Sequence, residues 1–203
     1  KVNNKRLRYF THVEVDILLD ALKSKSQQVH DMALFSLHTG ARAGEVFSLT
    51  WGVVNLKNGT AQLRDGKGVD RHAYLTDATQ SMLEQLHQEQ DPSELVFTDS
   101  EGEKITKISN TFERTVKELG LNNGVTDSRD KAIFHTCRHT FASWHVQNGT
   151  DLYTVKELLG HSTIQLTERY SHLRPDGLKK AARRFDNQLK ENNIVPIEKT
   201  DNG

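Results

Sequence analysis

The sequence has little of several features that define other protein classes. Its 203 residues include one cysteine, Cys137, and equal numbers of basic and acidic residues, 27 of each. A single cysteine excludes an internal disulfide and fits a reducing compartment. No apolar run approaches the roughly 20 residues of a membrane-spanning helix, and no secretory signal is recognisable. We therefore expect a soluble, cytoplasmic protein without a membrane partner. The net charge gives no support for nucleic-acid binding.

The length of the chain suits one well-packed domain with short flanks. The first residue is Lys1 and not methionine, so we expect a piece of a longer protein. We expect residues 1–10 to be a linker from a missing N-terminal DNA-binding domain, residues 11–191 to form the folded domain and residues 192–203 to form a flexible tail.

Most of the chain shows the hydrophobic period of helices. Thr11, with Glu14 placed for a capping box, begins the first of them. The further helices are predicted over residues 29–38, 43–49, 77–90, 109–119, 135–147, 151–159, 162–170 and 176–191. A period of two predicts short strands at residues 53–54, 60–63 and 71–75. The predicted fold class is α+β, mostly α, a helical domain with a small three-stranded antiparallel sheet near one edge.

Two basic residues near the predicted strands could bind an anion. Arg42 lies between two predicted helices in TGARAGEV, and a guanidinium can make two parallel hydrogen bonds to a phosphate. A surface arginine at a helix start is the simpler alternative. Lys67 lies between Gly66 and Gly68 at a strand turn, which suits either a loop that closes on a ligand or an ordinary hairpin.

The segment HTCRH places three polar side chains on one helix face. His135, Arg138 and His139 are spaced at i, i+3 and i+4. A zinc site would need a carboxylate where Arg138 stands, and Cys137 is turned away from a Cys/His pairing. An anion site made by Arg138 and His135 fits better, and a purely structural cluster remains the main alternative.

The segment TDLYTVKELLGHSTIQLTERYSH, residues 150–172, is predicted to be two helices joined by a tight turn. Gly160 is placed for a left-handed C-cap, and Thr150 and Ser162 for N-caps. His161 would then lie beside a helix N-terminus, which favours an anion. Tyr170 follows nine residues later and is normally a packing residue, unless a phosphate is held against it.

In this order and spacing the motifs resemble the catalytic domain of tyrosine recombinases, the phage-type integrases. The motifs are TG-x-R-x-x-E, GKG on a strand turn, H-x-x-RHT-F-A, and LGH followed by tyrosine. The resemblance covers residues 10–184. Gly44, Thr136-Cys137 and Tyr74 depart from the common pattern, which puts loop geometry in question more than activity.

The resemblance implies a site-specific DNA recombinase of mobile elements that cleaves and rejoins strands through a 3′-phosphotyrosyl bond. It implies that Tyr170 is the nucleophile, that Arg42, Arg138 and His161 hold the scissile phosphate, that Lys67 is the general acid, and that His135 is an acid/base or phosphate ligand. No metal, ATP or other cofactor is implied. The alternatives are a type IB-like topoisomerase, a hairpin resolvase, a catalytically silent DNA-binding relative and, more weakly, a metal-dependent phosphodiesterase.

The implied partners are double-stranded DNA attachment sites, and DNA would place the protein at the nucleoid. A homotetramer on DNA, a monomer when isolated and accessory DNA-bending proteins are further expectations. The apolar stripe of the helix at residues 176–191 fits packing either in cis or on a neighbouring protomer.

Overall fold

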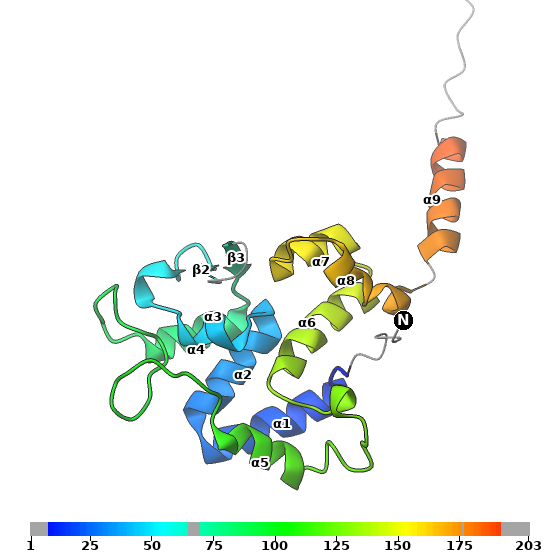
Figure 1. Ribbon diagram of the computed structural model, residues 1–203. Coiled ribbons are helices and arrows are strands. Elements are labelled where there is room, and N and C mark those ends of the chain that lie inside the picture. Colours follow the sequence, from blue (N-terminus) through cyan, green and yellow to red (C-terminus); the bar gives the residue numbers. More distant parts are fainter. Residues whose placement is uncertain (1–7, 65–69, 176, 192–203) are drawn as a thin grey trace, which may run out of the picture.

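The computed structural model describes residues 8–64, 70–175 and 177–191, and these form a mostly helical fold with one small sheet (Figure 1). The α-helices of the described residues are α1 His12–Lys25, α2 Gln27–Thr39, α3 Ala43–Phe47, α4 Asp77–Leu86, α5 Asn110–Glu118, α6 His135–Gln147, α7 Leu152–Leu159, α8 Gln165–Glu168 and α9 Gly177–Glu191. The strands are β1 Val54–Asn55, β2 Thr60–Leu63 and β3 Arg71–Tyr74. The predicted fold class is confirmed.

Local sequence signals set several element ends. The Thr11 hydroxyl accepts from the Glu14 amide at 3.2 Å and the Glu14 carboxylate accepts from the Thr11 amide at 2.8 Å, which completes the predicted capping box of α1. Gly40 and Gly160 adopt the left-handed conformation that ends α2 and α7, with φ of 67° and 62°. The N-cap of α7 is Asp151 and not Thr150, because its carboxylate accepts from the amides of Tyr153 and Thr154.

The three strands form one antiparallel sheet in the order β1-β2-β3. Ala61 pairs with Ala73 and Leu63 with Arg71, so the inward residues of β2 and β3 face the same side. The β2–β3 connection at residues 65–69 lies outside the described residues.

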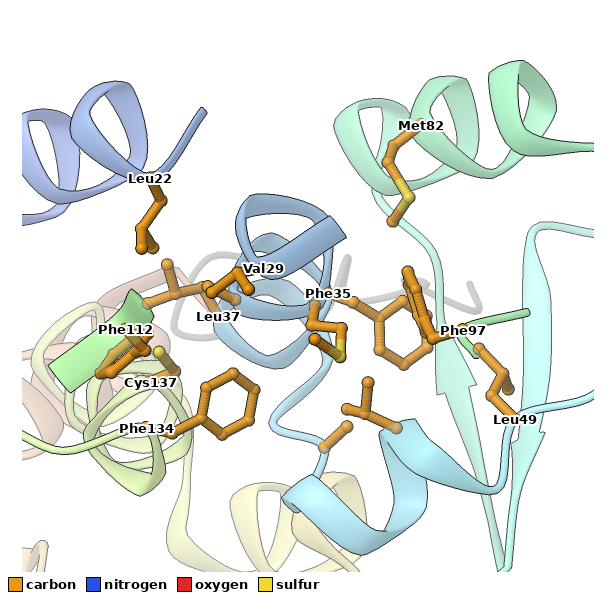
Figure 2. Packing of buried hydrophobic residues seen from close by; sticks show 14 of the residues in the cluster. Leu22, Val29, Phe35, Leu37, Leu49, Met82, Phe97, Phe112, Phe134 and Cys137 are labelled. Atoms are coloured by element: carbon orange, nitrogen blue, oxygen red, sulfur yellow. The ribbon is translucent and has the colours of Figure 1, made fainter. Parts of the chain in front are cut away.

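The main hydrophobic core surrounds α2, which lies between α1, α6 and the sheet side of the molecule (Figures 1 and 2). Figure 2 shows Val29, Phe35 and Leu37 of α2 among side chains from the surrounding elements. Phe10 belongs to this core as well, because its ring is buried and its amide donates to Thr140 Oγ1 at 2.9 Å. A residue of the predicted linker thus docks on α6, while the domain boundaries themselves stay predictions.

A second, smaller hydrophobic cluster joins α6 to α7 and contains Tyr170. Its buried members are Phe141, Ala142, Val146, Val155, Leu159 and Tyr170. Helix α6 contributes to both hydrophobic clusters and also carries Arg138 with its polar neighbours. The packing of α6 therefore positions the two clusters and these polar residues relative to one another.

Two predicted elements differ from the structure. The predicted helix over residues 162–170 is wrong: α8 covers only Gln165–Glu168, and a 3₁₀ turn at Ser171–Leu173 follows Tyr170. Helix α4 ends at Leu86, four residues before the predicted end.

Helix α9 leads away from the rest of the fold (Figure 1). Its Phe185 and Leu189 are exposed, by 63% and 52%. None of the helices in the described ranges is long and apolar enough to span a bilayer.

Candidate active site

Arg138 lies at the centre of the site and joins two helix ends. It is buried in α6, with 2% of its surface exposed. Its Nη1 donates to the Gly40 carbonyl at 2.6 Å and its Nη2 donates to the Leu159 carbonyl at 2.7 Å. Within the described ranges Arg138 forms no ion pair with a carboxylate. Its guanidinium is therefore a fixed buried cation whose charge is not matched by a contacting anion.

Two glycines allow this close packing. A Cβ atom at Gly40 would lie 2.7 Å from the Phe141 ring, and one at Gly160 would lie 2.6 Å from Arg71 Cδ. Both positions also have the positive φ that side chains disfavour. The glycines of TG-x-R and LGH are thus required by the close approach of backbone to the residues around Arg138.

Arg42 is the N-cap residue of α3 and is held by Glu45. Its amide donates to Glu45 Oε2 at 2.8 Å and its Nη1 donates to Glu45 Oε1 at 3.1 Å. The Arg42 side chain keeps 31% of its surface exposed, whereas that of Glu45 keeps 2%. Glu45 therefore both holds a helix end and pairs with a basic group, and it leaves part of the Arg42 side chain accessible.

Arg71 of β3 links the sheet to the same cluster. Its Nη2 donates to Glu45 Oε2 at 3.1 Å, and its Nη1 donates to the carbonyls of Thr39 and Leu158 at 3.2 and 2.7 Å. One buried arginine thus ties together β3, the end of α2, α3 and the end of α7. No sequence motif had singled out Arg71.

Burial and, after it, the positive charges of the cluster keep the neighbouring histidines neutral. Desolvation, followed by the charges of Arg138 and Arg42, lowers the pKa of His161 to about 3 and that of His135 to about 4. One side of the His135 ring is exposed, so solvent screens part of the effect of the arginine charges on its pKa. At neutral pH both rings are uncharged and can donate or accept hydrogen bonds.

The pKa of Arg138 itself is lowered to about 9, first by desolvation and then by the charge of Arg42. It still carries its charge at neutral pH. His161 is fixed by a 2.8 Å contact between its Nδ1 and Thr167 Oγ1. The expected helix N-terminus beside His161 is wrong, because α8 begins four residues later and is only four residues long. Attraction for an anion at this site therefore comes from the arginines.

Tyr170 is buried beside these cations, with 1% of its surface exposed. Its Oη lies 2.8 Å from Nδ1 of His139. Desolvation raises the pKa of the phenol to about 12, and the charges of Arg138 and Arg169 oppose that rise. The phenol is protonated at neutral pH and lies within the electrostatic reach of Arg138.

Five of the six predicted site residues are therefore brought together: Arg42, His135, Arg138, His161 and Tyr170. The sixth, Lys67, lies outside the described residues. The cluster offers a buried and a half-exposed cation, two neutral imidazoles and a phenol. This combination suits the binding of a phosphate next to an oxygen nucleophile.

The thiol and metal alternatives gain no support. Cys137 is fully buried and burial raises the pKa of its thiol, which disfavours the reactive thiolate. In the part of the chain that the structure describes, no three histidine, cysteine or carboxylate side chains group as metal ligands would.

Sequence reasoning missed the roles of His139, Arg71 and Arg169. His139 was placed on the right helix face, but its contact with Tyr170 joins positions 31 residues apart. Arg169, next to Tyr170, is exposed and lowers the pKa of all three site histidines. Its position directly before the tyrosine was the available signal.

The sequence and the fold are similar to those of known proteins. Residues 8–176 match the model of the phage integrase family. The tyrosine recombinase XerA of Saccharolobus solfataricus is 29% identical over 180 residues, which cover 88% of this chain and 57% of the relative. The integrase of Salmonella phage P22 is 28% identical over 197 residues, which cover 90% of this chain and 48% of the relative. The chain thus spans about half the length of these relatives.

A solved structure covers almost the same extent as this chain. The catalytic domain of bacteriophage HP1 integrase superposes with a TM-score of 0.68 at 26% identity, and the match covers 88% of this chain and 95% of that domain.

Proposed function

The chain belongs to the phage integrase family, and from this we propose that it is the catalytic domain of a site-specific DNA recombinase. The proposed reaction cleaves and rejoins DNA strands through a 3′-phosphotyrosyl intermediate. The observation that carries the proposal is the buried cation Arg138, fixed by two backbone carbonyls and close enough to Tyr170 to act on its pKa. A phenol held in such a cationic site has a neighbouring place for the phosphate it would attack.

In the proposed reaction, Tyr170 Oη attacks a DNA phosphate and displaces the 5′-oxygen. Arg138 and Arg42 stabilise the charge that grows on the non-bridging oxygens, a contribution on the order of 3 kcal/mol for each donor in comparable sites. His161 and His135, neutral at working pH, hydrogen-bond to the same oxygens. Lys67 protonates the leaving 5′-oxygen, because an alkoxide is a poor leaving group at neutral pH.

The phosphotyrosyl bond would keep the energy of the phosphodiester that it replaces. A 5′-hydroxyl from a second duplex can therefore attack it and release Tyr170 without ATP or a metal ion. Exchange of strands between two attachment sites follows if the second attack uses the partner duplex. We propose that this activity serves a mobile element and takes place on DNA in the cytoplasm, at the nucleoid.

Assembly on DNA is proposed to involve α9. The exposed Phe185 and Leu189 supply an apolar stripe that is not covered within the described residues, which supports packing of α9 on a neighbouring protomer over packing in cis. Such packing in a ring would give a homotetramer on DNA and a monomer in its absence. We further propose accessory DNA-bending proteins, a linker at residues 1–10 that leads from an N-terminal DNA-binding domain, and a flexible tail at residues 192–203.

The reaction class is tested by covalent capture on a random pool of duplexes, so that the target sequence need not be chosen in advance. The duplexes are nicked near the centre, incubated with the chain in buffer with a chelator, and run on a denaturing gel. We expect a protein–DNA adduct with the wild-type chain and none with Tyr170→Phe. Absence of any adduct, or DNA cleavage that stops in the chelator, would contradict the proposal. Sequencing of the captured DNA then identifies a defined duplex substrate.

A further inference from the structure

His139 contacts Tyr170, and this contact has no role in the reaction proposed above. It follows Arg138 in α6, and its Nδ1 lies 2.8 Å from Tyr170 Oη. Among the described residues, the phenol oxygen of Tyr170 makes no other side-chain hydrogen bond. A phenol in a site with 1% exposure needs an acceptor for its proton. If His139 carries its own proton on Nε2, then Nδ1 is that acceptor.

The groups around His139 keep it neutral in the free protein. Desolvation, followed by His135, Arg169, Arg138 and His161, lowers the pKa of His139 to about 3. The His135 ring contacts it edge-on, with ring centroids 4.6 Å apart. A neutral imidazole faces a protonated phenol, so the phenolic proton stays on Tyr170 until something changes the surrounding charge.

The other two site histidines are engaged elsewhere. His161 Nδ1 contacts Thr167 Oγ1, and His135 lies on the exposed side of the cluster. Neither has a hydrogen bond to Tyr170 among the described residues. Among the described residues, His139 is therefore the one histidine of the three that contacts the proposed nucleophile by a hydrogen bond.

We propose that His139 is a further catalytic residue, the base that takes the proton of Tyr170 when this oxygen attacks the phosphate. This assignment rests on the proposed function. As the bond between Oη and phosphorus forms, the phenolic proton moves to Nδ1 of His139. The bond between phosphorus and the 5′-oxygen breaks, and the 5′-oxygen leaves with a proton from the general acid. In religation the proton returns from His139 to Tyr170.

The arrangement also links proton transfer to the arrival of DNA. Arg138 and Arg169 hold down the proton affinity of His139. A phosphate seated against the arginines neutralises part of that charge, which makes the imidazolium easier to form. The nucleophile therefore stays protonated in the free protein and gains a working base when the substrate is bound.

The test removes the proposed base and, as a separate change, makes the phenol of the nucleophile more acidic. His139→Asn keeps a hydrogen-bond acceptor near the position of Nδ1 but cannot take a proton. We expect adduct formation on the captured duplex to slow by about 10²- to 10⁴-fold at neutral pH, the usual contribution of a general base. Fluorinated tyrosine at position 170, whose phenol is more acidic, should restore much of the rate in His139→Asn, because its proton leaves without help. Raising the pH should have the same effect.

His145→Asn is the matched control, because His145 lies in the same helix and contacts Thr150 and the Phe141 ring instead of Tyr170. It should form adduct at the wild-type rate. If fluorinated tyrosine leaves the defect of His139→Asn unchanged, or if His139→Asn cleaves normally, His139 is not the base. A wild-type chain that forms no adduct would instead contradict the proposed function, and this assignment with it.

A second measurement uses the unmutated protein and does not depend on how a variant folds. Nitrogen-15 NMR of labelled histidine reports which ring nitrogen of His139 carries the proton. The proposal requires the proton on Nε2 and a bare Nδ1. A proton on Nδ1 would mean that His139 donates to Tyr170, and would overturn it.

Discussion

Removal of the Glu45 carboxylate should destabilise the fold more than loss of any surface ion pair does. The side chain of Glu45 is 2% exposed and accepts from Arg71 Nη2 and Arg42 Nη1, each at 3.1 Å. Removing one partner of a buried ion pair typically costs about 3–5 kcal/mol. Arg71 keeps its carbonyl contacts and Arg42 is partly exposed, so for Glu45→Ala we expect about 3 kcal/mol, the lower end. Glu45→Gln keeps the shape and should cost about 1–2 kcal/mol.

Urea unfolding followed by circular dichroism measures these costs. A loss of about 3 kcal/mol moves the midpoint down by on the order of 1 M. Asp186→Ala is the control, because it removes an exposed i,i+4 pair with Lys190 and should cost at most about 0.5 kcal/mol.

A double-mutant cycle decides whether the Glu45–Arg71 contact carries the effect. The combined loss in Glu45→Ala/Arg71→Ala should fall short of the sum of the single losses by at least about 1 kcal/mol. Strict additivity of the two losses would refute the reasoning, because it would mean that Arg71 does not depend on Glu45.

Three further predictions concern charge, pH and assembly. Arg138→Lys cannot reach both carbonyls that Arg138 joins, so adduct formation should fall by about 10²-fold or more while circular dichroism remains that of a folded chain; an unchanged rate would contradict the assigned role. His139 and His161 have folded pKa values of about 3 against 6.5 for the unfolded chain, so between these values the unfolded state binds more protons. The contribution of these two rings to the free energy of unfolding should therefore be constant above pH 6.5 and fall below it, by at most about 1.4 kcal/mol per pH unit for each ring. Urea titrations from about pH 7.5 to about pH 4.5 that showed no fall would contradict the assigned burial. Deletion of residues after Arg174 should abolish recombination of two captured sites and leave adduct formation on one, because α9 is proposed to act between protomers; equal loss of both would favour packing in cis.

Local rules predicted much of this fold because the relevant interactions are local. The capping box at Thr11 and Glu14 and the left-handed glycines at positions 40 and 160 each depend on residues within one helical turn. The predicted helix over residues 162–170 failed because tertiary contacts override its pattern. Thr167 is fully buried and its hydroxyl contacts His161, which favours a turn where the pattern predicted a continuous helix.

The sequence motifs predicted which residues belong to the candidate site, but not which of them contact one another. HTCRH placed His135, Arg138 and His139 on one face, yet nothing in that spacing tells which histidine contacts a tyrosine 31 residues away. Arg71 had no local signal either, since its partners come from three other parts of the chain. Such long-range contacts depend on the packing of α6, α7 and the sheet, which sequence periodicity does not specify.

If the buried phenol of Tyr170 is the nucleophile, peptide mapping of the covalent adduct should find the DNA on this residue. Tyr74 and Tyr153 are 65% and 69% exposed and are far more accessible to any reactive phosphate than Tyr170, at 1%. After nuclease and protease digestion, mass spectrometry should find the nucleotide remnant on the peptide that contains Tyr170, attached through a 3′-phosphate. A remnant on Tyr74 or Tyr153 would show that Tyr170 is not the nucleophile, and a 5′-phosphate linkage would contradict the proposed 3′-phosphotyrosyl intermediate.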